Sequence, residues 1–202
     1  MTRLVVATHN TKKLAELRRI LIAEMPGVEV VGLDDVPSYD EPPEIENTFE
    51  GNALIKARAA VAATGLPALA DDSGICVEAL NSMPGVLSAR WSGAPRDDQR
   101  NNDLLLAQLA DVPDERRHAE FRCAVAFVLP DGAEHIEIGV MRGRILREPH
   151  GEAGFGYDPI FVADGHSVSN AELSAPDKDR ISHRGRALRD IVPTVAKALR
   201  RR

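Results

Sequence analysis

The sequence lacks long apolar runs, has few cysteines and carries no excess of basic residues, and each absence excludes a class of protein. No run approaches the roughly 20 apolar residues that a helix needs to cross a bilayer, so we expect no membrane partner. The only cysteines, Cys76 and Cys123, lie in apolar stretches without metal or redox spacing, which favours buried thiols. The net charge of −6 argues against a nucleic-acid polymer as partner, although it does not exclude a small phosphate ligand.

A signal-peptide layout is also missing, because residues 3–8 already read as a buried strand. We therefore expect a cytoplasmic protein. The 202 residues, 44% hydrophobic and 28% charged, predict one globular domain spanning 1–202. Lysine is scarce among the 25 basic residues, and since arginine is not equivalent to lysine, each lysine is a mild hint of function. The lysines are Lys12, Lys13, Lys56, Lys178 and Lys197.

Strand-like and helix-like segments alternate in the first half of the chain. We expect strands at 3–8 and 28–33, a helix after Asn10 that ends by Gly27, and an alanine-rich helix from Thr48 to Gly65. A helix near 98–109 then precedes a long hairpin of 118–129 and 133–146 and a short strand at 159–162. From Ser174 the chain reads as helix to its end, kinked or divided at Pro193. This order predicts an α/β fold with a mixed sheet.

Two adjacent carboxylates, Asp71 and Asp72, stand between apolar stretches, where burial is costly unless something neutralises them. Neighbouring strand residues point to opposite faces, so both acids can line one pocket only if the strand ends there. Ser73 and Gly74 directly afterwards indicate that it ends or bends. One use of the pair is to bind Mg²⁺ together with substrate phosphates, with a carboxylate as general base. A turn in which one aspartate accepts backbone N–H groups explains the pattern equally well.

The segment THNTKK, residues 8–13, suits a phosphate at the start of a helix. Thr8, Asn10 and the first helical N–H groups would surround one point, where the helix dipole adds positive potential. Lys12 or Lys13 could reach over the same point. From spacing alone an ordinary loop is favoured, with Asn10 as N-cap and exposed lysines, because the P-loop pattern is absent.

The segment EIENTFEGNALIKA holds two acids and one lysine of interest. Glu44 and Glu46 could complete a metal site, and Lys56 is the lone lysine of an alanine-rich helix. Exposure to solvent explains the glutamates as well, and the lysine nearly as well.

The segments GFGYD, residues 154–158, and DKDRISHRG, residues 177–185, offer groups for purine recognition. Phe155 or Tyr157 could stack on a base, and Arg184 beside His183 could donate to a ring carbonyl. The alternatives are a core aromatic turn and a helix start with a solvated basic face.

Taken together and in order, these segments resemble the inosine triphosphate pyrophosphatase family, also called non-canonical purine nucleoside triphosphatases. The resemblance covers essentially the whole chain. Two departures from the family pattern are His9, where a small residue is common, and Gly51, where many members have glutamate. The matching motifs are T-x-N-x-x-K at 8–13, T-F-x-x-N-A-x-x-K-A at 48–57, A-D-D-S-G at 70–74, P-G-x-x-S-A-R at 84–90, F-G-Y-D-P-I-F at 155–161 and I-S-H-R-G at 181–185.

The resemblance implies Mg²⁺-dependent hydrolysis of ITP, dITP and XTP to the monophosphate and pyrophosphate, which keeps these nucleotides out of DNA and RNA. It implies an elongated α/β fold, in which a mixed central sheet and flanking helices form two lobes around a nucleotide-binding cleft, and a homodimer. Asp72 would bind the metal and accept the proton of the attacking water, with Glu44 as second metal carboxylate. The triphosphate would be held by Thr8, His9, Asn10, Thr11, Lys12, Lys13 and Lys56. Ser73 would contact the substrate, and its base and sugar would be held by Phe155, Gly156, Tyr157, Asp158, Lys178, His183 and Arg184.

Two other functions remain as alternatives. A pyrophosphatase for pyrimidine or modified triphosphates conflicts with the base-side segments FGYD and SHR. A nucleotide-sensing module that binds without hydrolysis conflicts with the intact Asp72 and the set of lysines. A purely structural role would leave the adjacent aspartates and the placed lysines unexplained.

Overall fold

The computed structural model describes residues 3–200, which form two compact units. Unit 1 consists of the described residues up to Asp72, of Cys123–Gly139 and of those from Arg184 onward; unit 2 consists of Ser73–Arg122 and Val140–His183. No helix within the described residues is long and apolar enough to cross a membrane. That residues 1–202 form one domain, and that the protein is cytoplasmic, stay predictions.

Parallel strands form the first part of the sheet, in unit 1. β1 (Arg3–Val6) pairs in parallel with β2 (Glu29–Val31) and with β3 (Ala68–Val77). The strand order there is β2-β1-β3-β5-β6, and β5 (His118–Val128) and β6 (Glu134–Ile145) are joined by a tight turn at 129–133. The predicted hairpin is therefore confirmed.

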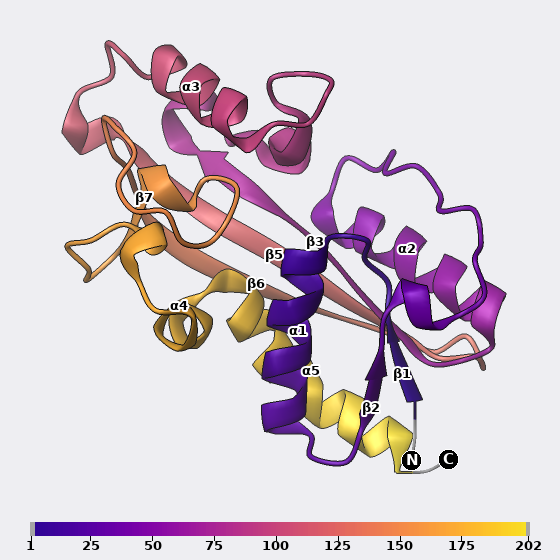
Figure 1. Cartoon of the computed structure of the whole chain (residues 1–202). Coiled ribbons are helices and arrows are strands. Elements are labelled where there is room, and N and C mark those ends of the chain that lie inside the picture. The colour runs from indigo at the N-terminus through magenta and orange to yellow at the C-terminus, as the bar shows by residue number, and fades with distance from the viewer. Residues whose placement is uncertain (1–2, 201–202) are drawn as a thin grey trace. The chain divides into compact units, whose positions relative to one another are not determined.

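Two helical layers cover this part of the sheet in unit 1. Helices α1 (Thr11–Glu24) and α5 (His183–Leu199) pack on one face, and α2 (Phe49–Thr64) packs on the other (Figure 1). Alternate strand residues supply the two hydrophobic clusters: Leu4 and Leu69 face α1 and α5, whereas Val5 and Ala70 face α2. The predicted caps of α2 are confirmed, because the Thr48 hydroxyl accepts the N–H of Gly51 and Gly65 adopts a left-handed conformation.

Unit 2 contains the continuations of β3, β5 and β6 and two antiparallel additions. β4 (Met83–Pro84) pairs with β3, and β7 (Phe161–Ala163) pairs with β6. Helices α3 (Asp98–Gln108) and α4 (Ala175–Ile181) belong to this unit, and its core includes Ile75, Leu105 and Phe161. Parallel and antiparallel pairs together confirm the predicted α/β fold with a mixed sheet and flanking helices.

The C-terminal helix divides at a different residue than predicted. Ser182 separates α4 from α5, and α5 continues through Pro193. The proline ring is exposed, while Ile191 before it and Val195 after it are buried in the same hydrophobic cluster. Burial on both sides of the proline therefore keeps the helix continuous despite the lost hydrogen bond.

The sequence predicted that the strand ends or bends at Ser73-Gly74, and the end is wrong, because β3 runs unbroken from Ala68 to Val77. Gly74 instead permits a close approach by the 3₁₀ segment that follows β4. A Cβ atom on Gly74 would collide with the carbonyl oxygen of Gly85 and the hydroxyl of Ser88. The glycine is needed for packing and not for a chain reversal.

Replacing Gly74 with alanine should destabilise the protein by about 1–3 kcal/mol, the usual cost of overpacking a rigid interior. The obstructing carbonyl belongs to the backbone, so a side-chain rotation cannot relieve the clash. Urea unfolding of both proteins measures the difference, and an unchanged midpoint would contradict this interpretation.

Candidate active site

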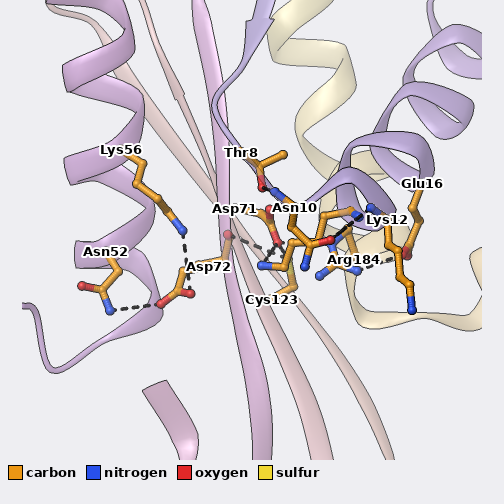
Figure 2. A network of polar contacts seen from close by, with 12 residues as sticks. Thr8, Asn10, Lys12, Glu16, Asn52, Lys56, Asp71, Asp72, Cys123 and Arg184 are labelled. Carbon is orange, nitrogen blue, oxygen red and sulfur yellow. Dashed lines mark hydrogen bonds and ion pairs between the residues drawn. The ribbon is translucent and has the colours of Figure 1, made fainter. Parts of the chain in front are cut away.

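The two adjacent aspartates of β3 lie on opposite faces of the strand, as the period of a strand requires. Asp71 lies on the face of α1 and α5, and Asp72 lies on the face of α2 (Figure 2). Both are buried, with 1% and 6% of their surface exposed. Each needs its own set of partners, which makes two adjoining polar clusters in unit 1.

Asp71 is the centre of a buried ion cluster. Its Oδ2 atom accepts from Nζ of Lys13 at 3.1 Å and from Nε of Arg184 at 3.2 Å, and the Sγ atom of Cys123 lies 3.9 Å away. Burial alone would raise the pKa of Asp71, but the charges of Lys13, Arg184 and Lys56 outweigh it and hold the pKa well below its usual range. Asp71 is therefore a permanent anion that anchors Lys13 and Arg184.

Arg184 lies almost entirely inside this cluster. Its Nη1 atom donates to Oε2 of Glu16 at 2.9 Å, and the residue is 1% exposed. Burial disfavours its charge, yet Glu16 and Asp71 together raise the pKa of Arg184. The predicted contact of Arg184 with a base or sugar stays a prediction.

Asp72 has a different environment. Its Oδ2 atom accepts from Nδ2 of Asn52 at 3.0 Å, and its Oδ1 atom lies 3.9 Å from Nζ of Lys56. The Lys56 ammonium in turn donates to Oε1 of Glu44 at 2.8 Å. Burial raises the pKa of Asp72, and the positive charges of Lys56 and Lys13 only partly offset it. Asp72 is therefore the more basic of the two carboxylates, the property that a general base needs.

The segment Thr8–Lys13 leads from β1 into α1 next to these clusters. Asn10 is the N-cap, since its Oδ1 atom accepts the backbone N–H groups of Lys12 and Lys13 at 3.1 Å each, and the Thr8 hydroxyl accepts the N–H of Asn10. The cap is confirmed, and Lys12 is exposed as expected of an ordinary loop. Lys13 is not, because its side chain turns inward to Asp71. His9 extends outward to within 3.2 Å of Glu41.

In unit 2, two of the predicted base-side residues, Phe155 and Lys178, contact a third, Asp158. The Oδ2 atom of Asp158 accepts hydrogen bonds from Nζ of Lys178 at 2.5 Å and from the N–H of Phe155 at 2.9 Å. Its Oδ1 atom accepts a hydrogen bond from Nδ2 of Asn170 at 3.3 Å. The Lys178 ammonium lies 4.9 Å from the centre of the Phe155 ring. This arrangement holds the aromatic ring beside a buried cation.

The neighbouring aromatic residues of unit 2 have different environments. Tyr157 is a core residue whose hydroxyl donates to the carbonyl oxygen of Ser88, as the alternative of a core aromatic turn expects. The His183 ring stacks on Phe121 with centroids 4.9 Å apart.

The predicted residues thus fall into two groups. One group, in unit 1, holds the phosphate and metal candidates and also Arg184; the other, in unit 2, holds Ser73 and the other base-side candidates. Glu16, Asn52 and Cys123 were not predicted as site residues, although the T-F-x-x-N-A motif contained Asn52. Asn52 could have been predicted as a site residue from its position, because it lies one helical turn before Lys56 in an alanine-rich helix and both side chains are on one face.

The carboxylates beside Lys56 fit a magnesium ion whose other ligands would be substrate phosphates and water. No group of three or more histidine, cysteine, aspartate or glutamate residues in the described part of the chain is placed to hold a metal. Mg²⁺ is commonly bound through only one or two carboxylates plus substrate phosphates and water. Asp72 and Glu44, which share the Lys56 ammonium, are a pair of carboxylates of this kind.

The profile of the Ham1 family matches residues 4–194 of the chain. The chain is 62% identical over 197 residues to a dITP/XTP pyrophosphatase of Nocardia farcinica, which covers 97% of this chain and 96% of that protein. It is 56% identical to a dITP/XTP pyrophosphatase of Corynebacterium efficiens, with 96% and 97% covered.

Two solved structures have folds similar to that of this chain. A nucleoside-triphosphatase / dITP/XTP pyrophosphatase from Mycobacterium abscessus is 56% identical and superposes with a TM-score of 0.78, over 95% of this chain and all of that one. A HAM1 protein from Coxiella burnetii is 40% identical, with a TM-score of 0.84, over 98% of this chain and all of that one.

Proposed function

Since this chain belongs to the Ham1 family, we propose that it hydrolyses the purine nucleotides ITP, dITP and XTP to the monophosphate and pyrophosphate. It would thereby remove these nucleotides from the pool before they enter DNA or RNA. The observation that carries the proposal is the buried carboxylate of Asp72, which Asn52 and Lys56 hold from the face of α2.

Asp72 is the residue that we assign as general base. Release of pyrophosphate requires cleavage of the anhydride between the α- and β-phosphates. We assign the attack to the α-phosphorus, where the attacking water must lie against a carboxylate that is basic enough to take its proton. The raised pKa of Asp72 meets this need, whereas the lowered pKa of Asp71 does not. Asp71 then holds Lys13 in place and does not itself meet the metal.

The triphosphate would bind at the start of α1. The Asn10 cap orders the first turn of this helix, whose N-terminus attracts anions, and Lys12 and Lys13 add positive charge. Lys56 keeps its charge despite burial, because burial lowers its pKa less than Asp71, Asp72 and Glu44 together raise it. Phosphoryl chemistry depends on this neutralisation and alignment more than on covalent steps.

Asp72 and Glu44 are the residues that would hold Mg²⁺. When bound, the ion would neutralise charge on the phosphate oxygens and orient the triphosphate. Lys56 donates to Glu44 and also lies 3.9 Å from Asp72, so the Glu44 carboxylate is kept near Asp72. A homodimer in solution is a further part of this proposal, expected from the family resemblance alone.

The base and sugar would be held in unit 2 by Phe155, Asp158, Lys178 and His183. Hypoxanthine and xanthine carry an oxygen at C6, where adenine carries an amino group. A site whose donors bond this oxygen rejects adenine, because those donors would then stay buried and unpaired. The ring of Phe155, held beside Lys178, offers a surface for stacking.

The test is hydrolysis of ITP, XTP, GTP, ATP and UTP by the purified chain with Mg²⁺, followed by phosphorus NMR. We expect pyrophosphate from ITP and XTP and little from the other three. In ¹⁸O-water the label should enter the nucleoside monophosphate, as attack at the α-phosphorus requires. Label in the pyrophosphate would place the attack at the β-phosphorus, and orthophosphate as product would contradict the assigned anhydride bond. Pyrophosphate mainly from UTP would indicate a pyrimidine enzyme, and tight binding without turnover would indicate a sensing module.

A further inference from the structure

Asn52 is a fully buried polar residue in the first turns of α2, a helix whose buried side chains are otherwise those of alanines. Asparagine is a poor helix former, and its amide costs free energy in an apolar interior unless it is hydrogen-bonded. Such a residue is expected where its hydrogen bonds perform a specific task. Its partners therefore indicate what that task is.

The carboxamide of Asn52 joins β3 to the loop before α2. Its Nδ2 atom donates to Oδ2 of Asp72 at 3.0 Å and to the carbonyl oxygen of Glu46 at 3.3 Å, and its Oδ1 atom accepts the N–H of Glu46 at 3.0 Å (Figure 2 shows the bond to Asp72). Both donors and the acceptor oxygen are used. The side chain thus fixes the backbone of Glu46, two residues after Glu44, and one oxygen of Asp72.

Lys56 lies one helical turn after Asn52 and completes this arrangement. Its ammonium faces the other oxygen of Asp72 and donates to Glu44. Asn52 and Lys56 therefore hold Asp72 from one helical face, and each also holds a residue of the acidic loop. The two carboxylates that would bind metal are linked through these two side chains.

Gly51 brings the loop close to the helix by an independent route. A Cβ atom on Gly51 would lie 2.7 Å from Cβ and from Cγ of Glu46, closer than atoms pack. Two consecutive residues of α2 thus position Glu46: Asn52 through hydrogen bonds, and Gly51 because it has no side chain that would collide with Glu46.

We propose that Asn52 is a positioning residue that orients Asp72 and seats the loop carrying Glu44, so that the two carboxylates reach one divalent cation. The inference rests on the proposed function, which identifies Asp72 and Glu44 as the metal ligands. It assigns Asn52 no contact with the substrate. Outer partners of metal ligands typically contribute 10–100-fold to metal affinity or activity, which sets the effect expected here.

The experiment compares the wild-type chain with N52A and measures binding of Mn²⁺ alone by electron paramagnetic resonance. We expect the dissociation constant for Mn²⁺ to rise about 10–100-fold in N52A. With ITP, kcat should fall by a similar factor, while KM for ITP at saturating Mg²⁺ should change less than about threefold, because a positioning role gives Asn52 no contact with phosphate or base.

Thr48→Ala is the matched control. It removes the N-cap of the same helix, at a cost of about 1 kcal/mol, without touching Asp72 or Glu46. It should lower the urea midpoint yet leave Mn²⁺ binding and kcat unchanged. If N52A behaves like T48A, or if the wild-type chain binds no Mn²⁺, the positioning role is overturned.

Gly51→Ala tests the inference should N52A fail to fold. Its new methyl group would displace Glu46 while keeping the Asn52 amide, so a weakened affinity for Mn²⁺ is again expected, and an unchanged affinity would count against the seating of the loop. Failure of the wild-type chain to hydrolyse ITP would reject the proposed function alone, because the Mn²⁺ measurements need no turnover.

Discussion

Replacing Asp72 with asparagine should lower kcat for ITP by about 10²–10⁴-fold, the usual contribution of a general base. The amide has the shape of the carboxyl group but cannot accept the proton of the attacking water. It also removes one of the two carboxylates assigned to the metal. Pyrophosphate release from ITP with saturating Mg²⁺ measures the loss.

The same substitution should leave the protein as stable at pH 7 as the wild type, or slightly more stable. Burial raises the pKa of Asp72, so its charged form is less favourable in the folded than in the unfolded chain. For such a group, the favourable contribution to stability exists at low pH and is lost as pH rises through the folded pKa. A neutral asparagine avoids that loss. Retained turnover would contradict the role of Asp72 as general base. An unfolded variant would contradict the expected stability.

The sequence predicted the arrangement of the two aspartates only in part. The strand period places neighbouring side chains on opposite faces, and the structure confirms this for Asp71 and Asp72. The expected end of the strand was wrong because Gly74 serves close packing against Gly85 and Ser88, a contact between segments that local pattern does not show. A glycine in a strand has both meanings, and only the packing partner decides between them.

The partners of Asp71 could not be predicted from local pattern at all. Lys13 lies 58 residues away in sequence and Arg184 lies 113 residues away, and they meet only because α1 and α5 pack on the same face of the sheet. The family resemblance pointed to both residues but assigned them to phosphate and base. Their shared bond to a buried carboxylate is a feature of the folded chain. Similarly, Ser182 divides the last helix where the sequence offered the more conspicuous Pro193.

Replacing Asp71 with asparagine should destabilise the protein by about 3–5 kcal/mol, the cost of removing one partner from a buried ion pair. Two cations, Lys13 and Arg184, would lose their common acceptor oxygen, although Arg184 would keep its ion pair with Glu16. Asp71 and Asp72 are adjacent, yet their asparagine variants should affect stability in opposite ways. Urea unfolding at pH 7 gives the comparison.

The pH dependence gives a second test of Asp71. Because its folded pKa is lowered, the stability that it contributes is fully present above its unfolded pKa of about 3.9 and is lost as pH falls toward the folded value. The difference in stability between wild type and D71N should therefore be constant near neutrality and shrink below about pH 4. Asp35→Asn is the matched control, since Asp35 pairs with Arg18 at the surface, 2.7 Å away, and the amide oxygen of the asparagine can still accept the Gly32 N–H. This substitution should move the urea midpoint much less than D71N does. Equal urea midpoints for D71N and D35N would mean that the buried cluster contributes no more to stability than a surface ion pair does. Lys13 would then be positioned by contacts other than its bond to Asp71.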